Sequence, residues 1–209
     1  MRTSNNLTTI LNAIALLLIP MSGVAAERTE CVLDAARIAA LLDLPFEEFD
    51  QQEGSGWRPL YEDKCYPQAA SLIVAYMERH PDLLEKQYIL PFHAGQMFAL
   101  NGQYDKAIAY MQKGYQTPAY TRPINWNAYA TATIAFLRRD RAELVKQREL
   151  IDQQPPMRKS PGLPDSYIGK KMNLDVVDRF IACFDEPFSV AFLEGCEKAT
   201  SAGNGTPGN

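Results

Sequence analysis

The chain has 209 residues, of which 21 are basic and 25 acidic, so its formal net charge is −4. This length fits one domain that is large enough to bury its own core. An acidic balance lacks the positive field that sequence-independent nucleic-acid binding requires, and we therefore exclude a nucleic-acid partner. The chain as a whole has no electrostatic attraction to anionic lipid either.

The N-terminus has the layout of a secretory signal peptide. Residues 1–26 carry one basic residue, no acid, and an apolar run that ends at Pro20. Val24 and Ala26 place small side chains at −3 and −1 of a cut before Glu27, which predicts an exported protein, periplasmic or secreted. Cleavage leaves 20 basic and 25 acidic residues, a net charge of 20 − 25 = −5, and no membrane span. The alternative is an uncleaved anchor, because the same segment could nearly span a bilayer.

Four cysteines follow the predicted cut, namely Cys31, Cys65, Cys183 and Cys196. An even number in an oxidising compartment predicts two disulfides, for which three pairings are possible. We favour Cys31–Cys65 and Cys183–Cys196, because each pair is close in sequence and flanks helices that should be neighbours. The chain has no CxxC and only two histidines that could join a cysteine site, so we expect no metal and no cofactor.

The apolar residues recur at helical spacing along most of the chain, and no long segment alternates with period two, so we predict an all-α fold. The predicted helices span residues 31–42, 66–79, 84–100, 104–116, 125–138 and 141–152, with C-terminal helices within 173–195.

The stretches between these helices also carry signals. Trp57 begins a short packed segment after a glycine-containing turn, and residues 153–172 form a proline-rich loop. Asn173 is expected to cap the helix that follows it. Residues 197–209 have no core pattern, and we expect them to be disordered.

Small and aromatic residues follow a fixed spacing in residues 94–118, where the pattern consists of Gly95, Phe98, Gly102, Tyr104, Ala107, Met111, Gly114 and Pro118. This spacing resembles a tetratricopeptide repeat. The helix 66–79 has matching positions at Tyr66, Ala69, Ile73 and Tyr76, and Pro81 follows it. Residues 125–152 have the lengths of a further pair but lack its small residues.

The resemblance implies a single TPR-like domain, residues 27–196, whose repeat-like region covers about 57–152. It implies antiparallel helix pairs stacked into an α-α superhelix, with Gly95 and Ala107 where two helices cross closely. The alternative is an ordinary helical bundle with a chance match. Such arrays bind peptides or proteins on a concave face, which here would be formed by Phe92, His93, Gln96, Leu100, Trp126 and Asn127. The polar members are the better candidates, because packing explains the apolar ones.

Motifs for chemistry are few. The sequence has no nucleophile–base motif, no phosphate-binding loop and no zinc-protease motif. For His93 we expect a packed, hydrogen-bonded histidine, since no nucleophile motif is nearby. Glu47, Glu48 and Asp50 form an acidic cluster, and paired carboxylates can hydrolyse glycosides. A solvated loop is the simpler interpretation of that cluster.

Basic residues flank the proline-rich loop, namely Arg158, Lys159, Lys170 and Lys171. They could hold an acidic partner or be solvated charges. The leading hypothesis is an exported, non-catalytic protein–protein interaction or scaffolding module. The alternatives are an all-helical envelope hydrolase that uses carboxylates near Glu47–Asp50, and an inhibitor of another exported enzyme. An enzyme predicts a deep pocket with a carboxyl group of raised pKa, whereas a scaffold predicts an open groove.

Overall fold

The structure is a computed structural model that describes residues 31–83, 88–116, 124–161 and 163–196. The helices are α1 (Ala35–Leu42), α2 (Arg58–Glu62), α3 (Tyr66–Arg79), α4 (Ile89–Leu100), α5 (Tyr104–Lys113), α6 (Trp126–Leu137), α7 (Arg141–Asp152) and α8 (Leu174–Ala182). Single helical turns lie at Glu47–Gln51, Pro81–Leu83, Asp165–Tyr167 and Val190–Glu194. The described residues form no strand, so the predicted all-α class is confirmed. The predicted signal peptide and tail lie outside these residues.

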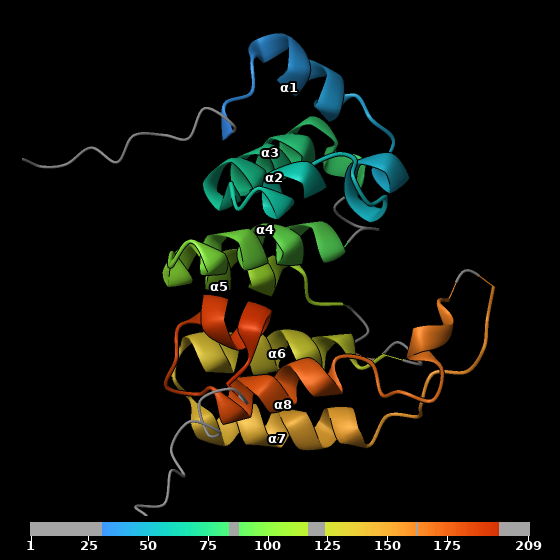
Figure 1. Cartoon of the computed structure of the whole chain (residues 1–209), viewed down its shortest axis with the longest axis vertical. Helices are drawn as coiled ribbons and strands as arrows, with labels where there is room; N and C mark the ends of the chain where they lie inside the picture. Colours follow the sequence, from blue (N-terminus) through green and yellow to red (C-terminus); the bar gives the residue numbers. More distant parts are fainter. Residues whose placement is uncertain (1–30, 84–87, 117–123, 162, 197–209) are drawn as a thin grey trace, which may run out of the picture.

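The helices are stacked along the long axis of the molecule (Figure 1). From one end the order is α1, then α2 with α3, then α4 with α5, and finally α6 with α8 and α7. Short turns join the members of the pairs α4–α5 and α6–α7, which contact each other extensively.

The helix ends follow from local chemistry. The Asp34 side chain accepts a hydrogen bond from the Arg37 main-chain N–H at 2.7 Å and caps α1, which begins at Ala35, four residues later than the 31–42 prediction. The predicted cap at Asn173 is wrong. Its backbone is left-handed, with φ 66°, and its side chain makes no capping bond, so Asp175 in the first turn is the side chain that opposes the helix dipole.

Both preferred disulfides are confirmed. Cys31–Cys65 joins the segment before α1 to the start of α3, with a Cα–Cα distance of 5.3 Å. Cys183–Cys196 joins the end of α8 to the residues after the last helical turn, with a Cα–Cα distance of 5.5 Å. The two bonds therefore fasten the two ends of the helical stack.

The crossing of α4 and α5 is close at Gly95. A methyl group on Gly95 would lie 2.5 Å from Met111 Cγ and 2.9 Å from the main-chain oxygen of Ala107, which is too near for any larger residue without movement. Ala107 is itself fully buried. The two small residues thus lie where the backbones of the pair approach.

The core is centred on α4 and α6, which are buried nearly all round. Helices α3 and α5 pack on α4, while α5, α7 and α8 pack on α6. The C-terminal part of the chain covers α6 with aromatic side chains. The ring centroid of Phe136 in α6 lies 4.9 Å from that of Phe180 in α8 and 6.2 Å from that of Phe188. Consequently neither α4 nor α6 presents a broad face to solvent.

Candidate functional site

A fully buried carboxylate, Asp50, is the centre of the most connected polar cluster. Its Oδ1 accepts hydrogen bonds from Trp57 Nε1 at 2.9 Å and from His93 Nδ1 at 2.8 Å. Gln51 Nε2 donates to Oδ2. The Arg58 guanidinium donates twice to the Asp50 main-chain oxygen, at 2.9 and 2.6 Å. Residues from a helical turn, from α2 and from α4 therefore meet at one carboxylate.

The segment between Asp50 and Trp57 is folded tightly enough to close this cluster. Gly56 has φ +57°, and a methyl group there would lie 1.8 Å from the main-chain oxygen of Phe49, so only glycine fits. The Phe49 ring stacks on Tyr76 of α3 with centroids 3.7 Å apart. This stacking anchors the turn on the core and directs the next side chain, Asp50, toward His93.

The surroundings keep Asp50 ionised. Burial by itself raises the pKa of the Asp50 carboxyl, but the attraction to His93, the hydrogen bonds from His93 and Trp57, and the Arg58 charge together hold that pKa below its usual value. The carboxylate is therefore a hydrogen-bond acceptor and not a general acid. Because Nδ1 of His93 is bonded to this carboxylate, Nε2 is the ring nitrogen that is left for another hydrogen-bond partner.

His93 retains 13% side-chain exposure, so its ring is not sealed from solvent. A carboxylate bonded to Nδ1 is the arrangement that orients a histidine as a general base. Among the described residues, however, no serine, threonine or cysteine is bonded to His93. All four cysteines of the described residues are in disulfides, so none of them offers a free thiol. The described part of the chain also contains no group of three or more side chains suited to hold a metal.

The predicted acidic cluster does not exist as one surface. Glu47 and Glu48 are exposed as expected, whereas Asp50 points inward and is fully buried. The solvated-loop interpretation is thus wrong for Asp50, because Trp57, Arg58 and His93 replace the water that this carboxylate loses. No sequence motif joins these residues, since His93 lies 43 positions away. The hydrogen-bonded state expected for His93 is present.

The residues predicted to line a concave face lie mostly inside the molecule. Phe92, Gln96, Leu100 and Trp126 are buried. The Asn127 side chain is bonded to the main chain of Gln116, at 2.8 and 3.0 Å. Gln96 therefore does not lie on an open face, because neighbouring helices cover α4, and Asn127 is half-buried. A partner contact at these residues stays a prediction.

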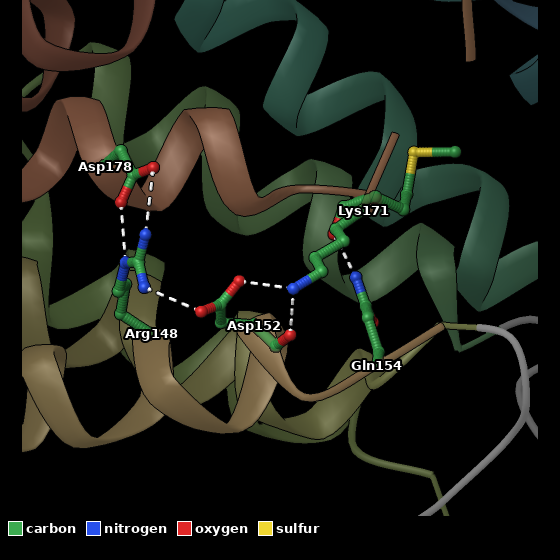
Figure 2. Close-up of polar contacts among 6 residues, drawn as sticks. Arg148, Asp152, Gln154, Lys171 and Asp178 are labelled. Carbon is green, nitrogen blue, oxygen red and sulfur yellow. Dashed lines mark hydrogen bonds and ion pairs between the residues drawn. The ribbon is translucent and has the colours of Figure 1, made fainter. Parts of the chain in front are cut away.

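A second polar network lies between α7 and α8 (Figure 2). Arg148 donates to Asp178 at 2.8 Å and to Asp152 at 3.2 Å. Lys171 donates to the other oxygen of Asp152 at 2.6 Å, and Gln154 donates to the main chain just after Lys171. These contacts fix α8 and the end of the proline-rich loop on α7. Sequence reasoning identified only Lys171 of this set.

An apolar groove of about 570 Å³ lies between α1 and α3, beside the first disulfide. Its lining includes Val32, Leu33, Ile38, Leu72 and Ala75. Val32 is 60% exposed, more than any other large hydrophobic side chain of the described residues, and it adjoins the apolar lining of the groove. This groove is an apolar surface feature of the described residues that could receive a partner.

Comparison with protein-family models, with curated proteins and with solved structures finds no match to this chain. Within the described residues, every helix is too short or too polar to cross a bilayer. The functional argument therefore depends on the geometry of the Asp50 cluster and of the α1–α3 groove.

Proposed function

We propose that the protein is an exported, non-catalytic protein-binding module built from a short tetratricopeptide-like array. Two disulfides support export, because such bonds persist in oxidising compartments. The stacked helix pairs and the close crossing at Gly95 support the array. The ionised state of Asp50 argues against a carboxylic acid catalyst, and the groove between α1 and α3 is open.

That groove is the observation on which the proposal depends. Within α1, whose residues are all described, only Leu41 is buried, and the exposed positions include Ala35, Ala36, Ala39 and Ala40. A terminal element of a helical array normally carries a polar outer face. The outer surface of α1, which is apolar apart from Arg37, and the groove beneath it are therefore suited to a further helix.

The occupant that fits best is an amphipathic helix of a protein partner. The groove runs between two helices, and an apolar helix face placed there would extend the stack by one layer. Burial of Val32 and of the groove lining would supply the free energy, since apolar contact area is the main favourable term in association. The small alanines of α1 would allow the partner's backbone to come close.

Site-specific cross-linking tests this proposal. A photo-reactive residue at Val32 should attach one defined partner, and the attached peptide should carry apolar residues at helical spacing. The double variant Val32→Glu/Ser71→Glu should lose that partner, because both positions are exposed and line the groove. Val145 on α7 is a matched control, being an exposed valine far from the groove. Equal labelling from position 145 would refute a specific groove.

An envelope hydrolase is the second candidate function. The pairing of Asp50 with His93 favours a hydrolase that uses a histidine base over one that uses two carboxylates. His93 Nε2 would activate a water molecule while Asp50 orients the ring. In that case the wild-type protein releases new reducing ends from envelope polysaccharide, and His93→Gln abolishes the release. The binding-module proposal instead predicts no turnover and unchanged partner capture in His93→Gln.

A further inference from the structure

The loop between α7 and α8 projects from the body of the helical stack (Figure 1). It is closed at its base by two main-chain hydrogen bonds, from Met157 N to Lys170 O at 2.8 Å and from Gly169 N to Met157 O at 2.9 Å. Lys171 then binds Asp152 of α7 and fixes this base on the domain. The loop is thus held in a defined position, although it extends away from the core.

The loop has the opposite charge from the rest of the protein. Residues 157–171 contain four basic side chains and one acid, Asp165, a net charge of 4 − 1 = +3. With the predicted mature charge of −5, the remainder carries −5 − 3 = −8. Within the described part of the chain, Arg158 and Lys170 are exposed and form no ion pair. Lys159 lies 3.7 Å from Asp165, but both are so exposed that this pair is weak.

Two large apolar side chains are exposed beside these cations. Tyr167 is 41% exposed and Ile168 is 38% exposed. Both immediately precede the Gly169–Lys170 segment that is bonded to Met157, so they lie close to Arg158 and Lys170. A solvated basic loop would explain the charges but not the adjacent tyrosine and isoleucine. Cations next to exposed aromatic and aliphatic groups are typical of segments that lie in a membrane interface.

We propose that this loop docks the protein on an anionic lipid surface. Arg158, Lys159 and Lys170 would approach the headgroups, while Tyr167 and Ile168 would enter the interfacial region. The acidic remainder of the protein is repelled by the same surface, which would direct the loop toward the lipid and the helical stack away from it. Helices α1 and α3, whose residues line the groove, lie at the opposite end of the stack from α7 (Figure 1), so the groove would remain free.

Vesicle co-sedimentation of the exported protein tests the charge requirement. Phosphatidylcholine vesicles with phosphatidylglycerol should bind at least about 10-fold more protein than phosphatidylcholine alone, because each basic side chain near the surface adds to the attraction. Binding should be lost at about 0.5 M NaCl, where the Debye length is only a few ångströms. Arg158→Glu/Lys170→Glu should reduce the partition coefficient by at least about 10-fold.

The matched control is Arg37→Glu/Arg138→Glu, which makes the same change in net charge at exposed positions on α1 and at the end of α6 away from the loop. It should change vesicle binding by no more than about twofold, since these positions lie beyond the screening length. Equal losses in the two double variants would overturn the proposal. So would equal binding to charged and uncharged vesicles.

A second pair of variants distinguishes lipid from an acidic protein surface. Tyr167→Ser/Ile168→Ser keeps every charge and should lower vesicle binding several-fold, because the apolar insertion is removed. Capture on immobilised poly-glutamate should be weak and unchanged by this variant. If poly-glutamate retains the wild type through Arg158 and Lys170 while anionic vesicles do not, the loop binds an acidic protein and the lipid proposal is wrong.

Discussion

The two polar clusters of this protein are similar in composition and different in their access to water. Asp50 is fully buried and is held by donors from Trp57, His93 and Gln51. The network between α7 and α8 is partly solvated, because the side chains of Arg148, Asp152 and Asp178 are 31%, 42% and 47% exposed. Both clusters connect segments that are distant in sequence.

This difference shows that the number of ion pairs in a cluster does not predict how much the cluster contributes to the free energy of unfolding. Around Asp50, water has been replaced by fixed donors, so that loss of one partner leaves a charge or a donor without any substitute. In the α7–α8 network, water and salt ions can replace a missing partner. The same carboxylate chemistry should therefore be costly to disturb at one end of the stack and cheap at the other.

Removing the two carboxylates separately gives the largest contrast. Asp50→Ala should lower the free energy of unfolding by about 3–5 kcal/mol, because it leaves His93 and the Trp57 N–H buried without an acceptor. Asp178→Ala should lower it by at most about 1 kcal/mol. Urea unfolding followed by circular dichroism measures both. Similar costs for the two variants would show that burial does not separate the clusters.

The two disulfides can be compared in the same way, by the free energy of unfolding that is lost when each is removed. Cys31→Ala/Cys65→Ala opens a loop with a sequence separation of 34, and Cys183→Ala/Cys196→Ala one of 13. The chain-entropy model predicts losses of about 4 and about 3 kcal/mol respectively. Thermal unfolding of the two variants would give the order, and a larger loss at the C-terminal end would contradict this model.

Acid should lower the free energy of unfolding mainly through the cluster around Asp50. Because the folded-state pKa of Asp50 is lowered, its stabilisation is complete above the unfolded-state pKa of about 3.9 and is lost as the pH falls through the lower folded-state pKa. The charged or titratable groups around it are His93, Arg58 and Tyr76. Asp50→Asn should therefore flatten the decline of unfolding free energy below about pH 4.

Asp152→Asn is the control for this titration. The hydrogen bond from Lys171 lowers the pKa of Asp152 as well, but this carboxyl is exposed to solvent. Its removal should leave most of the wild-type pH dependence in place. If Asp152→Asn flattens the curve as strongly as Asp50→Asn, acid sensitivity does not depend on the buried cluster.

The smallest expected effect concerns the pair Arg148–Asp178. A double-mutant cycle should give a coupling of about 0.2–1 kcal/mol at low salt. In about 1 M NaCl the coupling should approach zero, since the Debye length is then about 3 Å. The cost of Asp50→Ala should remain nearly constant over the same range, because buried charges are screened much less. A coupling energy that does not change with salt would show that the α7–α8 network is shielded from solvent as the Asp50 cluster is.

Local sequence determined the helices and the disulfide partners. Helical spacing of apolar residues located the segments that became α1 and α3 to α8, and short separations between cysteines favoured the pairing that occurs. Gly95 and Ala107 also carried information, because their small size is needed where α4 and α5 cross. In each case the cause lies within one helix pair or one short loop.

Tertiary structure alone decided which side chains lose water. From the sequence, Asp50 is expected to lie in an exposed turn with Glu47 and Glu48. His93, 43 positions away, reaches its carboxylate only because α4 packs beside that turn. Gln96 reads as a polar residue on an open face, yet α4 is covered by its neighbours in the stack. Burial depends on contacts between elements that are distant in sequence, and periodicity within one helix shows that a face is apolar without showing what covers the other faces.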